Sequence, residues 1–194
     1  VAAVGLLIGG GFALTWMRTD HSAELAASLF ADAQTHADKF APAGASASPA
    51  YLLSLVRHFH PAVLADAKRE RGSFAQYKPG YDEARYRDSM RIAIGKQIKE
   101  PDAVLLNECA RTLVTADKAT LADVAAAKVL AQQAVTIDGE KNYRSLITLG
   151  WTYFKSGDTK RARLIGEQAM EIAPDATAKA ECGDAIGSFV TKSE

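Results

Sequence analysis

The stretch from residue 143 to residue 174 constrains the fold of this chain more than any other part of it. Its apolar and small residues follow the spacing of two helices joined by a short turn. The pattern consists of Leu146, Leu149, Gly150 and Tyr153 on a first helix, Gly157 and Asp158 in a turn, and Ala162 and Ala169 on a second helix that ends at Pro174. Small residues let two helix backbones approach closely, so Gly150 is expected to face Ala162.

These spacings resemble the tetratricopeptide repeat, a helix–turn–helix unit of about 34 residues. The resemblance implies an all-helical scaffold for protein–protein contacts, with a groove lined mainly by the first helix of each pair. Gly166 departs from the family pattern, which has a bulky aromatic residue at that place. One contact with a neighbouring repeat is therefore expected to be missing.

A less regular pair of helices precedes this unit. Pro101 is well placed to begin a helix, and a partner helix is expected from Leu121 to Ile137. The seven-residue interval between Ala127 and Ala134 repeats the interval in the second helix of the clear unit. The turn, Thr115 to Thr120, is longer, so the pair resembles a degenerate repeat with an expanded turn.

The chain is expected to end in a helix from Thr177 to Val190, which fits the capping helix that closes such arrays. Residues 102–174 also resemble the helical tail that follows thioredoxin-like domains in some bacterial exported proteins. Asn107, the long turn and the turn at Gly157 and Asp158 carry that likeness. No Cys-x-x-Cys pair stands upstream, so the resemblance does not extend to oxidoreductase activity.

The segment from Val1 to Met17 contains no charged residue. At about 1.5 Å per residue it would reach about 25 Å, the short end of what spans a bilayer. We expect a transmembrane anchor here, with a buried helix and an uncleaved signal as alternatives. The expected fold class is therefore all-α: a single transmembrane helix, then a helical domain with about two tetratricopeptide-like helix pairs and a capping helix.

Small residues recur within this segment at Gly5, Gly9 and Ala13, and Trp16 follows near its end. Such a stripe allows another transmembrane helix to approach closely, and a tryptophan suits the membrane interface. Chance in a glycine-rich segment is the alternative. If the stripe is functional, these four residues contact a partner inside the lipid bilayer.

The remainder of the chain before residue 101 divides into three parts. Residues 18–41 form an expected amphipathic helix, residues 42–49 a flexible linker, and residues 50–100 a helical region with a basic, aromatic loop. Residues 101–194 form the tetratricopeptide-like domain with its capping helix. The basic and aromatic residues near the loop fit a solvated helix face better than a nucleic-acid site, because Tyr86, Met90 and Ile94 recur at core spacing.

Composition and motifs argue against an enzyme. The chain has 23 basic and 23 acidic residues, so no overall field attracts nucleic acid. It lacks a phosphate-binding loop, a serine elbow and a His-Glu metal motif. His58 and His60 lie two residues apart and fall on different helix faces. Cys109 and Cys182 are expected to be buried thiols, with a disulfide as the alternative. No catalytic, cofactor or metal site is expected.

Two functions follow from these expectations, and a structural role without a discrete groove function is the third alternative. The first is a membrane-anchored accessory, assembly or scaffolding subunit of a larger membrane complex, respiratory or photosynthetic for example, with its domain on the periplasmic side. The second is a soluble or exported adaptor that binds a peptide of a partner. Helical periodicity suggests that the groove contains Asn107, Arg111, Asn142, Arg144, Ser145, Thr148 and Thr152. Trp151 is expected to be a binding hot spot if it is exposed, and a packing residue if it is buried.

Overall fold

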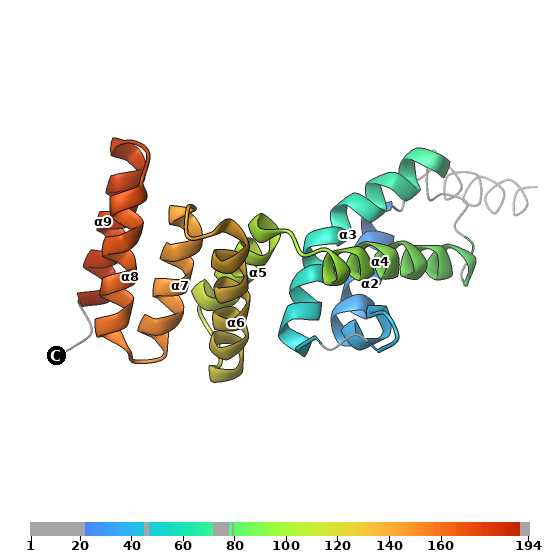
Figure 1. Ribbon diagram of the computed structural model, residues 1–194. Helices are drawn as coiled ribbons and strands as arrows, with labels where there is room; N and C mark the ends of the chain where they lie inside the picture. The colour runs from blue at the N-terminus through green and yellow to red at the C-terminus, as the bar shows by residue number, and fades with distance from the viewer. Residues whose placement is uncertain (1–21, 45–46, 72–77, 79, 191–194) are drawn as a thin grey trace, which may run out of the picture. The chain divides into compact units, whose positions relative to one another are not determined.

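The computed structural model describes residues 22–44, 47–71, 78 and 80–190. This part of the chain is entirely helical, with eight α-helices, one short 3-10 helix and no strand (Figure 1). The prediction of an all-helical protein is confirmed. The elements are α2 (Ser22–Thr35), η1 (Ala37–Phe40), α3 (Pro49–Arg71), α4 (Tyr81–Lys99), α5 (Ala103–Thr115), α6 (Leu121–Asp138), α7 (Tyr143–Lys155), α8 (Thr159–Ile172) and α9 (Ala176–Val190).

The predicted fold class is wrong in its membrane part. No helix among the described residues is both long enough and apolar enough to cross a bilayer. A span requires about 20 predominantly apolar residues, whereas α3, the longest described helix, carries Arg57 and Asp66 within its sequence. Residues 1–17, on which the transmembrane prediction was based, lie outside the described residues.

The chain divides into two compact units. The first comprises residues 1–45 and 55–95, and the second comprises residues 46–54 and 96–194. The first unit contains α2, η1 and most of α3 and α4. The second contains α5 to α9 together with the beginning of α3 and the end of α4.

The core of the first unit forms where apolar residues recur at helical spacing. On α4, Tyr86, Met90 and Ile94 are buried, as their spacing predicted. On the N-terminal side, Leu29, Ala33, Ala37 and Phe40 are buried along α2 and η1. The rings of Phe40 and Tyr86 pack edge to face with centroids 6.1 Å apart, a favoured geometry for aromatic pairs.

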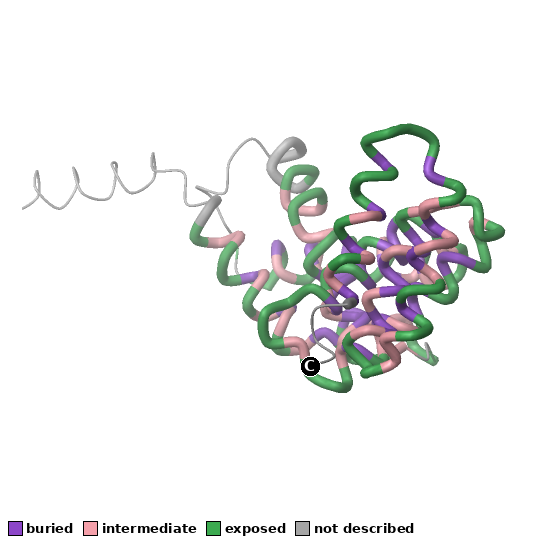
Figure 2. The backbone as a smooth tube through the Cα atoms, turned by 90° about the vertical axis from the view of Figure 1, so that its left-hand side faces the viewer, coloured by how far each residue is buried: buried purple, intermediate pink, exposed green. Residues whose placement is uncertain are grey.

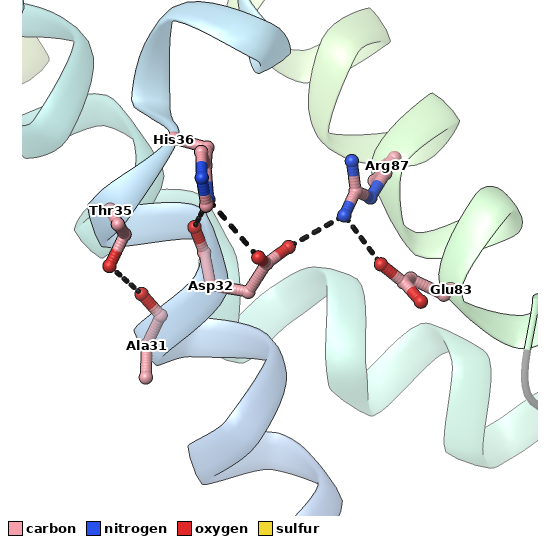
Figure 3. A network of polar contacts seen from close by, with 6 residues as sticks. All are labelled: Ala31, Asp32, Thr35, His36, Glu83 and Arg87. Atoms are coloured by element: carbon pink, nitrogen blue, oxygen red, sulfur yellow. Dashed lines mark hydrogen bonds and ion pairs between the residues drawn. The ribbon is translucent and has the colours of Figure 1, made fainter.

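A network of charged side chains connects α2 to α4 in this unit (Figure 3). The guanidinium of Arg87 donates to the carboxylate of Asp32 at 2.7 Å and also to Glu83. Nδ1 of His36 lies 3.2 Å from a carboxylate oxygen of Asp32, which is four residues earlier in the chain. The same guanidinium lies 5.8 Å from the centre of the Phe40 ring. Arg87 is one of the basic residues near the loop that were expected to lie on a solvated helix face, but these contacts show that it contributes to packing within the unit.

His60 and Tyr86 make the second polar contact of the first unit. Nδ1 of His60 lies 2.6 Å from the phenolic oxygen of Tyr86, and burial raises the pKa of Tyr86 to about 12. The phenol therefore keeps its proton and can donate it to a neutral imidazole. Burial lowers the pKa of His60, which favours the same neutral form.

Two antiparallel helical hairpins and a final helix build the second unit. α5 pairs with α6, α7 pairs with α8, and α9 packs on α8 and α7. The helices begin and end within a few residues of the predicted bounds. Each first turn is capped by a side chain that accepts a backbone N–H, which satisfies a donor that the helix cannot. The capping residues are Asp102, Thr120, Asn142, Asp158 and Asp175.

The turns between these helices explain two of the glycines. Gly139 and Gly157 have φ values of +61° and +86°, which residues with a side chain rarely adopt. Gly139 ends α6, and Gly157 forms the turn between α7 and α8 that the sequence predicted. Figure 2 shows buried and exposed residues alternating along the helices, as expected for elements that bury one face.

Close contacts between helices explain Gly150 and Gly166. A Cβ on Gly150 would lie 3.3 Å from the carbonyl oxygen of Ala162 and 3.1 Å from the ring of Phe189. A Cβ on Gly166 would lie only 2.7 Å from Cγ1 of Ile186. The absent side chain at Gly166 therefore leaves no gap, because Ile186 of α9 occupies the space.

This packing predicts opposite effects for two glycine-to-alanine substitutions. Gly166→Ala places a methyl group against Ile186, and overpacking of this kind costs about 1 to 3 kcal/mol. Gly187→Ala in α9 meets no atom within 4 Å, so the gain in helix propensity should stabilise the protein by about 0.5 to 1 kcal/mol. Urea unfolding measures both. A Gly166→Ala protein as stable as the Gly187→Ala protein would contradict the close approach.

The lowered pKa of His60 predicts that protons destabilise the first unit. Between its folded pKa and its unfolded value of about 6.5, the unfolded chain binds more protons than the folded chain, so the free energy of unfolding falls as the pH decreases. His60→Gln should reduce the slope of stability against pH below about pH 6.5. His58→Gln, at an exposed position, is the matched control. Equal slopes in the two variants and in the parent would refute the assignment.

Candidate functional site

A groove of about 760 Å³ lies in the second unit, lined by the first helix of each hairpin and by α9. α7 contacts both α5 and α9, so it lies between the two outer walls. The volume is within the range of about 300 to 1,000 Å³ that is usual for ligand sites. A groove of this size can hold a small molecule or a short peptide segment, whereas a folded domain would need a larger surface.

Asn107 is a buried polar residue of the groove. It points from α5, lines the groove and is only 8% exposed. Its side-chain oxygen is buried without a hydrogen-bond partner among the described residues. A buried polar atom without a partner costs about 1 to 3 kcal/mol, and native proteins contain few of them. The groove therefore holds an amide that a bound molecule could satisfy.

Trp151 supplies the aromatic surface of the groove. It is half-buried on α7, and its ring packs edge to face against Phe154 and Phe189 at centroid distances of 5.7 Å and 5.0 Å. Phe189 is fully buried. Trp151 is thus a packing residue on one side and a lining residue of the groove on the other.

The charged residues of the groove differ between its walls. Arg144 lies 3.8 Å from Glu181 of α9 and donates to the hydroxyl of Tyr143 at 3.0 Å. That hydroxyl in turn donates to Glu181 at 2.9 Å. By contrast, Arg111 on α5 and Asp184 on α9 make no ion pair with any described residue, and both are exposed.

The structure brings together the candidate residues of the C-terminal region. All five lie along the same groove: Asn107, Arg111, Arg144, Thr148 and Trp151. Asn142 lines it as well, whereas Ser145 and Thr152 are fully buried and do not. The other four candidates lie outside the described residues: Gly5, Gly9, Ala13 and Trp16.

Sequence reasoning missed the wall that α9 contributes. Glu181, Asp184 and Ser188 line the groove, although the last helix was expected to act only as a cap. Their spacing of three to four residues places them on one helical face. That polar stripe, opposite buried Cys182 and Phe189, was the signal available in the sequence.

The described residues contain no cluster of metal-binding side chains and no disulfide. No group of three or more His, Cys, Asp or Glu side chains is placed to hold a metal ion there. Cys109 and Cys182 are both free and buried, as expected. Burial raises the pKa of the Cys109 thiol to about 12 and also raises the pKa of Cys182.

Comparison with known proteins identifies no relative of this chain. No protein-family model, no curated protein and no solved structure matches it. The resemblance to tetratricopeptide repeats thus rests on the residues of the chain itself. Function has to be inferred from the shape, the burial and the charges of the groove.

The raised pKa values predict two unreactive thiols. Only the thiolate reacts with alkylating agents, and at about pH 8 both groups remain protonated and buried. Iodoacetamide should therefore label neither cysteine in the native protein, and both in guanidinium chloride. Mass spectrometry of the intact protein counts the labels. Rapid labelling of Cys109 in the native protein would show that α5 opens away from its neighbours.

Proposed function

We propose that the second unit is a peptide-binding adaptor of the tetratricopeptide-repeat type, which holds a short extended segment of a partner protein in the groove of α5, α7 and α9. One observation carries the proposal. A groove of suitable volume contains a buried side-chain amide, Asn107, whose oxygen has no partner within the described chain.

The arrangement of helices supports a repeat-type scaffold. Two helical hairpins follow one another, the first helices of both hairpins line the groove, and α9 takes the place of a further first helix. In repeat proteins such stacking creates a concave binding surface. The small residues Gly150 and Ala162 lie where α7 and α8 approach each other closely.

An extended peptide fits the groove better than a helix does. The backbone N–H groups of a helix are already bonded within the helix, whereas those of an extended peptide are free. A side-chain amide offers both an acceptor and a donor, so Asn107 can pair with a peptide group of the ligand. Trp151 and Ile147 then supply an apolar surface for an adjacent side chain.

Binding is proposed in preference to catalysis. The residues that line the groove include no histidine, the most frequent general base, and no cysteine; of its carboxylates, Glu181 is engaged by Tyr143 and Arg144. The hydroxyl of Thr148 donates to the carbonyl oxygen of Arg144 at 3.0 Å. Its proton is therefore already used in a hydrogen bond within α7. The other function that the sequence suggested, a subunit of a membrane complex, depended on residues 1–17, which lie outside the described chain.

Trp151→Ala is predicted to weaken peptide binding by at least about 2 kcal/mol, or about 30-fold, because it removes the largest apolar surface of the groove. A display library of random dodecapeptides, selected on the immobilised full chain, provides the ligands. Fluorescence anisotropy then measures the affinity of the enriched peptides. Gln133→Ala, at an exposed position of α6 outside the groove, is the matched control and should bind normally.

Asn107→Leu separates binding from folding. It removes an unsatisfied polar atom, so the free energy of unfolding should stay the same or rise by up to about 1 kcal/mol, while peptide binding falls. The variant thus remains informative if Trp151→Ala proves unstable. A library that yields no enriched peptide, or peptides whose affinity neither substitution changes, would refute the proposed function.

A further inference from the structure

The hydroxyl groups around the groove have already donated their protons. Thr148 donates to the carbonyl oxygen of Arg144 at 3.0 Å, and Ser188 donates to the carbonyl oxygen of Asp184 at 2.9 Å. Tyr143 donates to Glu181 at 2.9 Å. Because a hydroxyl has a single proton, these side chains offer a ligand only lone pairs. These three hydroxyl groups therefore act as acceptors toward a ligand.

Asn107 supplies a further hydrogen-bond acceptor. It lines the groove, and its side-chain oxygen is buried and accepts no hydrogen bond from any described residue. The amide remains unsatisfied until a ligand supplies a donor. A ligand rich in N–H groups would satisfy both this oxygen and the hydroxyl oxygen of Thr148.

The two arginines of the groove, Arg111 and Arg144, do not neutralise both acidic residues that α9 contributes, Glu181 and Asp184. Arg144 is balanced by Glu181 at 3.8 Å. Arg111 stands on α5, and α7 lies between α5 and α9. On the α9 wall, Asp184 has no ion-pair partner in the described chain. A carboxylate without a counter-ion attracts a cation most strongly when the neighbouring charges are already paired.

Trp151 suits the stem of a long cationic side chain. Its ring is held by Phe154 and Phe189, leaving the indole half-exposed along the groove. Lysine and arginine cover apolar surface with their methylene groups while their charged ends reach a polar partner. An aromatic face also attracts the cation itself.

We propose, on the basis of the adaptor function above, that the groove recognises a basic peptide: a lysine or arginine side chain lies along Trp151 with its charge against Asp184, while a backbone N–H of the same peptide donates to Asn107. The recognition is thus selective for positive charge on the α9 side of the groove. An acidic peptide would place its carboxylate against Asp184 and be repelled.

Three fluorescein-labelled nonapeptides test this inference by anisotropy with the full chain at low ionic strength. The first has the sequence Ser-Leu-Lys-Ser-Leu-Lys-Ser-Leu-Ser, and the others replace both lysines with glutamine or with glutamate. The lysine peptide should bind at least about tenfold more tightly than the glutamine peptide, and the glutamate peptide should bind most weakly. Added salt should reduce the difference.

Asp184→Asn should remove this preference, weakening the lysine peptide about tenfold and leaving the glutamine peptide unchanged. Glu171→Gln, which removes an exposed charge from α8 outside the groove, is the matched control and should leave all three affinities unaltered. Asn107→Leu should weaken both the lysine and the glutamine peptides, because its partner is the peptide backbone.

Several outcomes would overturn the inference. The glutamate peptide could bind as tightly as the lysine peptide, the Asp184→Asn and Glu171→Gln proteins could lose affinity equally, or none of the three peptides could bind. If library peptides bind in a manner that depends on Trp151 but contain no basic residue, the inference fails and the adaptor function stands. If the library also yields no ligand, both fail.

Discussion

The ring of Phe189 rests on two glycines of neighbouring helices, and the shape of the groove depends on that contact. A Cβ on Gly150 would lie 3.1 Å from the ring, and a Cβ on Gly166 would lie 3.4 Å from it. With hydrogen at both positions, α7 and α8 come close enough to α9 for the ring to be fully buried. Trp151 packs against this ring, so its position along the groove follows from Phe189.

α7 can occupy the middle of the unit because its polar residues are satisfied locally. Ser145 donates to Asp138 at 2.8 Å, and Thr152 donates to the carbonyl oxygen of Leu149 at 2.7 Å. Both residues are fully buried, so each hydroxyl needs a partner inside the protein. The helix therefore packs against α5, α6, α8 and α9 without leaving these groups unpaired.

Helical spacing predicted most of the second unit, because hairpins are held by contacts between residues near in sequence. The small residues Gly150, Ala162 and Ala169 are buried as expected. Ser145 and Thr152 were expected in the groove because polar residues usually face solvent, but their hydrogen bonds within the protein allow them to be buried.

The ion pair of Arg87 with Asp32 joins residues 55 positions apart, and no short-range pattern could reveal it. The role of α9 was missed because a capping helix is recognised by its apolar face alone.

Asn107 is an exception to this local satisfaction, as is Gln97, whose side-chain nitrogen is also buried without a hydrogen-bond partner among the described residues. The neighbours of Asn107 on α5 include buried leucine and cysteine residues. An apolar residue of similar size at this position would avoid the free-energy cost of an unpaired polar atom. Its unpaired oxygen therefore reduces the stability of the isolated protein, while the hydroxyl of Thr148 across the groove has a partner in its own helix. Departures from local consistency concentrate at functional sites, where binding restores what folding leaves unsatisfied. In the peptide-binding function proposed above, a donor from the ligand would complete the hydrogen bonding of Asn107 between α5 and α7.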